Sequence, residues 1–193
     1  RELPESVYLQ YVLFHRVNEE EIRPCRSLFY HQIQEQIRGK SPLETVLEIN
    51  YWCAGEVAYE AGDDRTLSAL SVWKRGYGRC GEESVFAVNV LRSAGIPARQ
   101  VYAPYWSHCD DNHAWVEVWV DGNWHYLGAC EPEPLLDLGW FEYAASRAML
   151  IHARRFDGER KAWNYDTEEP ESLREEEIGS EGMVTMENEI RRY

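Results

Sequence analysis

An alternating segment followed by a two-residue turn is the strongest constraint in this sequence. From His113 to Val120 every second residue is Ala or Val, and the residues between them are His, Trp, Glu and Trp. A period of two predicts a strand with one apolar face. Asp121-Gly122 favours a tight hairpin turn, and residues 124–129 then supply the returning strand. The sequence therefore predicts a small antiparallel sheet in which positions 128 and 130 share the face of His113.

A helix with clear ends is expected before this hairpin. Apolar residues recur at helical spacing after Cys80, Gly95 stands where a left-handed C-cap belongs, and Pro97 prevents continuation. We expect a largely buried helix of roughly 14 residues that starts at Cys80. A strand over Arg99–Ala103 follows it.

The N-terminal part of the chain shows the periodicity of helices. Apolar residues recur near every 3.6 positions over 7–17, 28–37 and 46–59. The third segment has a strong start, with Ser41 as N-cap, Pro42 at the first helical position and Glu44 three residues after the cap. We therefore predict an α+β protein with an N-terminal helical layer over residues 1–76 and a mixed core over 77–156.

The charge of the chain restricts its partners. With 20 Lys and Arg against 34 Asp and Glu, the formal charge is −14, which disfavours nucleic acid and anionic membranes. No apolar run approaches the roughly 20 residues that a membrane span needs. Residues 157–193 hold 12 acidic against 5 basic residues, so we expect an acidic arm or a linker to a neighbouring domain. Residues 1–8 lack a signal-peptide pattern, and the compartment stays open between cytoplasm and secretion.

Cys80 and His113 are the candidate catalytic pair. A cysteine that opens a helix is near the positive end of the helix dipole and unpaired N–H groups, both of which favour a thiolate. Arg79 beside it adds positive charge. A histidine can take and return the thiol proton at neutral pH. The alternative reading of each residue is structural: a buried small side chain for Cys80 and a hydrogen-bonded strand residue for His113.

The remaining cysteines and histidines do not indicate a metal or a disulfide framework. The five cysteines are an odd number without tightly repeated spacing. His108 and Cys109 are adjacent, whereas structural zinc sites use ligand pairs spaced by a few residues. We expect no metal and no cofactor.

Three motifs resemble a known family, the transglutaminase-like superfamily of papain-like fold. They are Gly78-Arg-Cys-Gly-Glu82, Leu91-Arg-Ser-Ala-Gly-Ile-Pro-Ala-Arg99 and Asn112-His-Ala-Trp-Val-Glu-Val118. The core signature is close to that of peptide N-glycanases, whereas residues 127–134 resemble bacterial transglutaminase-like proteins. The resemblance implies a catalytic helix packed on a small antiparallel sheet, with Cys80 as nucleophile and His113 as base. The paired CxxC zinc motifs of the N-glycanases are missing here.

One position departs from the family pattern. The aspartate that orients the histidine in the family corresponds here to Gly128, which has no carboxylate. Glu131, Asp110 or Asp111, or a backbone carbonyl are the replacements we consider. We favour Glu131, because it lies just past the vacant position and Pro132 bends the chain there.

The sequence thus predicts a cysteine-dependent amide hydrolase or acyltransferase, such as a thiol protease, acting on peptides, proteins or glycopeptides through a thioester. Hydrolysis is favoured over transamidation, because water is always present and an amine acceptor needs its own site. Trp106 and Trp52 are candidate substrate-binding residues, with core packing as the alternative for aromatic side chains at these spacings. The rival function is a weakly active or inactive module that binds peptide or glycan, since Gly128 removes the usual carboxylate.

Overall fold

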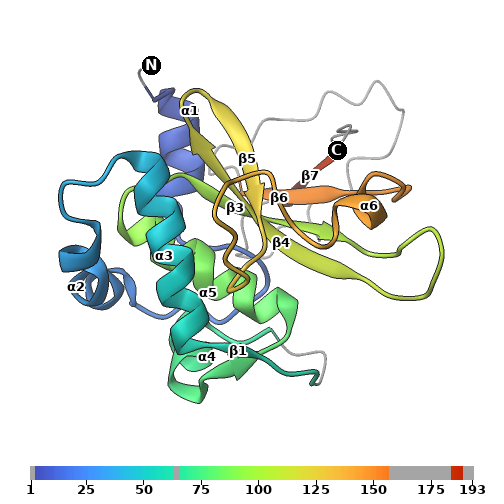
Figure 1. The fold of residues 1–193 in the computed structure, drawn as a ribbon, viewed down its shortest axis with the longest axis horizontal. Coiled ribbons are helices and arrows are strands. Elements are labelled where there is room, and N and C mark those ends of the chain that lie inside the picture. The colour runs from blue at the N-terminus through green and yellow to red at the C-terminus, as the bar shows by residue number, and fades with distance from the viewer. Residues whose placement is uncertain (1–2, 63–65, 157–183, 189–193) are drawn as a thin grey trace, which may run out of the picture.

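The computed structural model describes residues 3–62, 66–156 and 184–188 and has an α+β fold (Figure 1). The helical elements are α1 (Glu5–Tyr8), the π-helical turn η1 (Leu9–Leu13), α2 (Arg26–Ile37), α3 (Pro42–Glu56), α4 (Ala69–Arg75), α5 (Cys80–Ser93) and α6 (Glu142–Ala145). The strands are β1 (Ala58–Tyr59), β2 (Tyr77–Gly78), β3 (Ala98–Ala103), β4 (His113–Val120), β5 (Asn123–Leu127), β6 (His152–Phe156) and β7 (Val184–Asn188).

The main sheet has five antiparallel strands in the order β5-β4-β3-β6-β7. The predicted hairpin is confirmed: Trp119 pairs with Trp124, and Asp121 and Gly122 form the turn between them. Their φ angles of 53° and 88° are both left-handed, as the turn that matches the twist of two strands requires. Glycine adopts this geometry without strain, and aspartate tolerates it.

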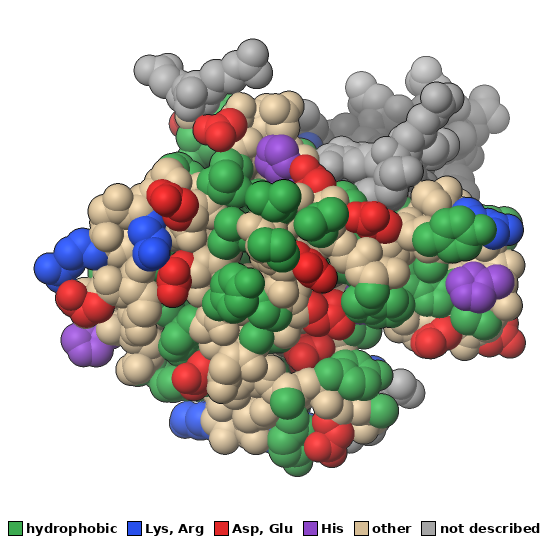
Figure 2. Space-filling model, in the orientation of Figure 1, with side chains coloured by type: hydrophobic (Ala, Val, Ile, Leu, Met, Phe, Trp, Pro, Cys, Tyr) green, Lys and Arg blue, Asp and Glu red, His purple; other side chains and the backbone are tan. Residues whose placement is uncertain are grey.

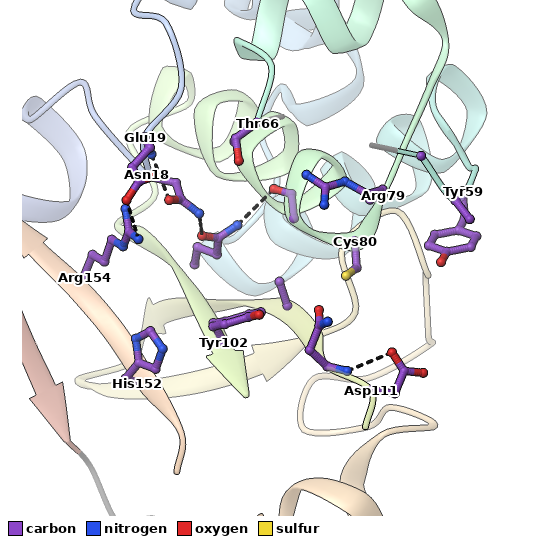
Figure 3. A pocket seen from close by; sticks show the side chains of 16 residues that line it. Asn18, Glu19, Tyr59, Thr66, Arg79, Cys80, Tyr102, Asp111, His152 and Arg154 are labelled. Carbon is purple, nitrogen blue, oxygen red and sulfur yellow. Dashed lines mark hydrogen bonds and ion pairs between the residues drawn. The ribbon is translucent and has the colours of Figure 1, made fainter. Parts of the chain in front are cut away.

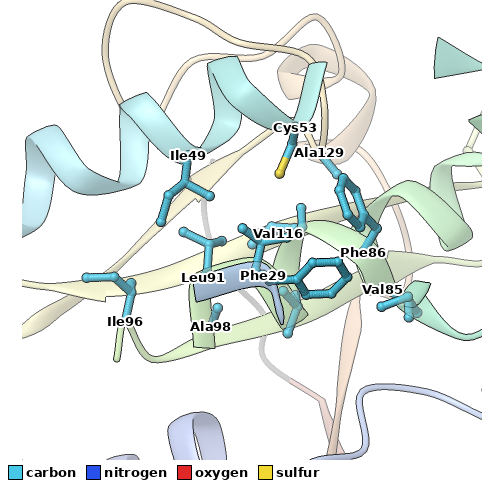
Figure 4. Close-up of a cluster of buried hydrophobic side chains, with 14 of the residues drawn as sticks. Phe29, Ile49, Cys53, Val85, Phe86, Leu91, Ile96, Ala98, Val116 and Ala129 are labelled. Carbon is cyan, nitrogen blue, oxygen red and sulfur yellow. The ribbon is translucent and has the colours of Figure 1, made fainter. Parts of the chain in front are cut away.

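Helix α5 lies between the sheet and the helices α2, α3 and α4 (Figure 1). It starts at Cys80 and spans 14 residues, as the sequence predicts, and Gly95 beyond its end has a left-handed φ of 80°. The alternation in β4 is confirmed as well, because its valines face this helix. Figure 4 shows the core between these layers, which includes Phe29, Ile49, Val85, Leu91 and Val116, all at most 1% exposed.

A second, smaller core covers the opposite face of the sheet. Trp106, Trp115 and Phe141 are its large members, together with alanines of β3 and β6. Trp115 alternates with the valines of β4, so the strand is buried on both faces. Consequently the two residue sets of the alternating segment belong to two different cores.

The first helical segment ends earlier than the range 7–17 predicted from the apolar periodicity. The helical turns end at Leu13, and Phe14 is extended with a ψ of 135°. Arg92 explains the difference, because its buried guanidinium donates to the carbonyl oxygens of Phe14 and Arg16 at 2.9 and 3.0 Å. Those carbonyls are available to Arg92 because the chain leaves the helix there.

The third helix begins as predicted and ends early. Ser41 and Glu44 form the expected reciprocal capping box at the start of α3. The helix ends at Glu56 rather than near Tyr59, because Ala58 and Tyr59 pair in parallel with β2. This small two-stranded sheet holds Tyr59 next to the residues that precede Cys80.

Strand β7 extends the sheet beyond residue 156, the predicted end of the core. Residues 184–188 pair antiparallel with β6, although they fall in the segment expected to be an acidic arm. The rest of that segment lies outside the described residues. Figure 2 shows Asp and Glu side chains spread over one face of the molecule. No helix within the described ranges is long and apolar enough to cross a membrane.

Candidate active site

Cys80 is the first residue of α5 and lies in the wall of a pocket of about 650 Å³ (Figure 3). The sheet side of the pocket is formed by Tyr102 and Ala114, which pair across β3 and β4. The other lining residues come from the segment before α2, from β1 and the segment that follows it, from the start of α5, from the loop before β4, and from β3 and β6. They are Asn18, Glu19, Tyr59, Ala61, Gly62, Thr66, Arg79, Gly81, Gln100, Asp111, Asn112, His152 and Arg154. A thiol at this position is accessible to a polar ligand.

The environment of the Cys80 thiol raises its pKa. Burial is the largest cause, and the charge of Glu83 acts in the same direction. Backbone N–H groups of Ala114 and Gly81 donate to the sulfur and lower the pKa, as does Arg79, but their effect is smaller. The N–H groups at the helix start thus act in the direction that the sequence predicts, but desolvation outweighs them and raises the pKa of Cys80.

His113 begins β4, one residue before the Ala114 N–H that faces the sulfur. Its side chain leaves the strand on the Trp115 face and packs against Trp140 and Phe141, with ring centroids 4.6 and 5.0 Å away. Nε2 is buried and has no hydrogen-bond partner among the described residues, and no hydrogen bond joins the imidazole to the Cys80 thiol there. Burial lowers the pKa of His113 to about 4, so the ring is neutral. The fold thus brings the thiol to the start of β4, but the side-chain pair is not hydrogen-bonded.

Glu131 fills the space beside Gly128. A Cβ on Gly128 would lie 2.5 Å from Oε2 and 2.9 Å from Cβ of Glu131. Both carboxylate oxygens accept from Nε1 of Trp140 at 3.0 Å, and the ring of Trp140 packs against His113. Burial raises the pKa of Glu131. Glu131 therefore approaches His113 through Trp140 rather than by a direct hydrogen bond.

The carboxylates considered in place of Glu131 lie in the loop before β4. Asp111 lines the pocket, and its charge raises the pKa of His113 against the larger effect of burial. Asp110 is exposed in the same loop. Neither carboxylate is hydrogen-bonded to the imidazole.

Glu83 is a buried acidic residue that the sequence analysis did not single out. Its side chain is only 3% exposed, and burial together with the charges of Glu131 and Glu82 raises its pKa to about 8. Glu83 follows Cys80 by three residues, so the two share a face of α5. In the sequence, this spacing of three residues was the signal that Glu83 lies on the same helix face as Cys80. The structure thus places a carboxyl with a raised pKa beside the candidate site.

The two tryptophans predicted to bind substrate do not line the pocket. Trp52 packs against Phe86 and Trp73 in the helical layer, with ring centroids 5.9 and 6.5 Å apart. Trp106 is buried in the small core, 6.2 Å from the ring of His113. Both positions match the packing alternative for these residues.

The pocket is instead bounded by an N-terminal segment that sequence reasoning missed. Asn18 donates to Oε1 of Gln100 at 2.6 Å, and Gln100 in turn donates to the Gly81 carbonyl at 2.9 Å. Glu19 forms an ion pair with Arg154 of β6 at 2.9 Å. These contacts join a loop, a strand and the start of α5 around the pocket (Figure 3). No periodicity in the sequence signals them, because each partner is distant in the chain.

No group of three His, Cys, Asp or Glu side chains that could hold a metal ion occurs among the residues that the structure describes.

A family model described as the transglutaminase-like superfamily matches residues 31–129, just over half of the chain. The chain belongs to this superfamily. The matched segment of this superfamily member contains α3, α5, both candidate catalytic residues and Gly128. No curated protein matches the chain.

Several solved structures have a similar fold. A candidate protease from Parabacteroides distasonis is 15% identical, with a TM-score of 0.51 over 78% of this chain and 28% of that one. A candidate cysteine protease from Cytophaga hutchinsonii is 21% identical, with a TM-score of 0.46 over 70% of this chain and 52% of that one. LapG of Legionella pneumophila is 18% identical, with a TM-score of 0.49 over 69% and 75%. This superfamily member spans about half the length of the Cytophaga protein. The similarity to the Parabacteroides structure supports the shared fold.

Proposed function

We propose that this superfamily member is a cysteine-dependent enzyme that transfers or hydrolyses acyl groups of amides, with Cys80 as the nucleophile. The observation that carries the proposal is the position of the thiol: it lies at the start of a helix, in a pocket wall, with two backbone N–H groups directed at the sulfur. N–H groups at such a place also stabilise the oxyanion that forms when a thiol attacks a carbonyl. The substrates are peptides, proteins or glycopeptides.

The reaction starts from a neutral thiol and a neutral imidazole, because burial raises the pKa of Cys80 and lowers that of His113. His113 takes the thiol proton as the sulfur attacks the amide carbon, and the amine leaves with that proton when the C–N bond breaks. Water then hydrolyses the thioester, which releases the acid and restores the thiol. Since the two side chains are not hydrogen-bonded, the imidazole must approach the sulfur when substrate binds.

Glu131 takes the place of the missing aspartate in this proposal. Its carboxylate lies where a side chain at position 128 would project, and Trp140 connects it to the ring of His113. Glu131 is therefore a positioning residue for the imidazole, acting through the indole. Among the described residues, no carboxylate accepts a hydrogen bond from Nε2 of His113.

The second candidate function is a binding module for peptide or glycan. Three observations favour it: Gly128 at the carboxylate position, the imidazole that has no bond to the thiol, and the raised pKa of Cys80. In this function the pocket binds its ligand and catalyses no reaction.

A thioester assay separates the two functions. The protein with Cys109→Ser, which removes the exposed thiol, is mixed with p-nitrophenyl acetate and analysed by intact mass and peptide mapping. The enzyme proposal expects one acetyl group on Cys80 and its turnover, with acetyl transferred to an added alkyl amine if amines are accepted. Cys80→Ala is the loss control, and Cys25→Ser is the matched control at a buried cysteine outside the pocket.

The same assay can contradict the enzyme proposal. If Cys80 is acetylated no faster than Cys25, the thiol is not a nucleophile. Retained binding of a peptide or glycopeptide by Cys80→Ala would then support the binding module.

A further inference from the structure

We propose that Cys53 and Cys130 form a modification site, which a low-molecular-weight disulfide such as oxidised glutathione converts into an intrachain disulfide. The site joins the middle of α3 to the segment that follows β5. It is separate from the thiol of Cys80 and does not depend on the proposed function.

Asn50 holds the main chain of Cys130 against α3. Its Nδ2 donates to the carbonyl oxygen of Gly128 at 2.9 Å, and its Oδ1 accepts from the N–H of Cys130 at 3.0 Å. Cys53 follows Asn50 by three residues, so both side chains project from the same face of the helix. The amide of Asn50 therefore holds the main chain of Cys130 against α3, one helical turn from Cys53.

The two thiols meet in the main core. Cys53 is completely buried and projects into the cluster that also contains Ala129, the residue before Cys130 (Figure 4). Cys130 packs against this cluster from its edge, is partly exposed, and its thiol is hydrogen-bonded to Cys53. Its backbone has a left-handed φ of 58°, a rare conformation for a residue with a side chain, which the two Asn50 bonds help to maintain.

The other three cysteines have different surroundings. Cys25 contacts Oδ1 of Asn89 at 3.7 Å, Cys80 lines the pocket, and Cys109 is exposed. They therefore provide internal comparisons for the reactivity of the pair.

The reaction proceeds in two exchanges that balance. The thiolate of Cys130, the partly exposed member, attacks oxidised glutathione, forms a mixed disulfide and releases one glutathione. The thiolate of Cys53 then attacks the Cys130 sulfur and releases the second glutathione, so the protein loses two electrons and two protons to the reagent. The pKa of Cys130 is raised by its hydrogen bond to Cys53 and by burial, so the first step accelerates with rising pH.

The crosslink changes what holds the segment beside the candidate site. In the reduced protein the Asn50 hydrogen bonds and core packing attach residues 128–131 to α3. A covalent bond adds a constraint that also acts on the unfolded chain. For a chain of this size we expect oxidation to raise Tm by about 5–10 °C.

The test uses the full chain with Cys109→Ser. This background is needed because trypsin finds no Lys or Arg between Arg99 and Arg147 and would leave Cys109 and Cys130 in one peptide. The protein is incubated with oxidised glutathione at pH 8.5 and digested without reduction after blocking free thiols. We expect a peptide that links Cys53 to Cys130, a mass loss of two hydrogens, and the rise in Tm.

Variants distinguish the crosslink from other effects. Cys130→Ser, at a partly exposed position, and Cys53→Ser should each abolish the linked peptide and the rise in Tm, whereas Cys25→Ser should keep both. The proposal is overturned if Cys130 carries glutathione while Cys53 stays free, or if Cys53 and Cys130 both remain unmodified. Either Ser variant alone suffices if the other fails to fold.

Discussion

The carboxylate of Glu131 occupies the volume that a side chain at position 128 would need. An ideal Cβ on Gly128 would lie 2.5 Å from Oε2 of Glu131 and 2.9 Å from its Cβ. Gly128 and Glu131 also form an isolated antiparallel bridge, and the N–H of Glu131 donates to the Gly128 carbonyl at 3.3 Å. The glycine and the glutamate are therefore a matched pair, and changing one affects the other.

The matched pair can be tested by a double-mutant cycle. Gly128→Ala alone should lower the free energy of unfolding by about 1–3 kcal/mol, because the new methyl group overlaps Glu131. In the Glu131→Ala background the same substitution should cost less, because the overlapping carboxylate is gone. Urea unfolding of the four proteins measures the coupling. Additive effects would show that the two side chains do not compete for space.

The pH dependence of Cys80 alkylation should reflect the raised pKa of its thiol. In the Cys109→Ser protein, the rate of iodoacetamide labelling at Cys80 should reach its midpoint above the ordinary cysteine value of 9.0, because burial disfavours the thiolate. Glu83→Gln should shift the midpoint downward, since the charge of Glu83 raises the pKa of Cys80. Peptide mapping at each pH gives the rate. A midpoint below the ordinary value of 9.0 would indicate a thiolate stabilised by the helix start instead.

His113 should titrate near pH 4 rather than at its ordinary 6.5, because burial disfavours the imidazolium. The unfolded chain then binds a proton between these values while the folded protein does not. The contribution of His113 to the free energy of unfolding is thus present above pH 6.5 and decreases as the pH falls to about 4.

The ring protons of His113 in NMR spectra give its titration directly. His113→Gln should reduce the loss of stability over the same pH window. A midpoint near 6.5 would show that the ring is solvated.

Glu83 should make the protein less stable as the pH rises. Its pKa is raised from 4.5 to about 8, so the folded protein keeps a proton that the unfolded chain has lost. The free energy of unfolding therefore falls between about pH 4.5 and 8. Glu83→Gln mimics the neutral form and should flatten this dependence, which thermal unfolding across pH can measure; Glu48→Gln, at an exposed ion pair, is the control. An unchanged slope would contradict the raised pKa.

Local chemistry determines much of this fold, and those parts could be predicted. The cap of α3, the length of α5 and the Asp121-Gly122 turn each depend on residues within a few positions of one another. The start of a helix at Cys80 followed from the same local patterns, whereas the papain-like fold was expected from the resemblance to the transglutaminase-like superfamily.

The parts that could not be predicted depend on distant partners. The end of the first helix depends on Arg92, far along the chain, and the pocket wall depends on Asn18 meeting Gln100. The charge states of Cys80 and His113 were also not predictable, because burial, which no local motif reports, dominates both.

The ion pair between Glu19 and Arg154 has a practical meaning for anyone shortening this chain. The segment from 31 to 129 that defines the superfamily retains the thiol and the imidazole, yet both members of the ion pair lie outside it. A protein trimmed to those limits would keep the Cys80 thiol and the His113 imidazole and lose this ion pair, whose two residues line the pocket. Four residues that line the pocket therefore lie outside the segment that the family model matches: Asn18, Glu19, His152 and Arg154.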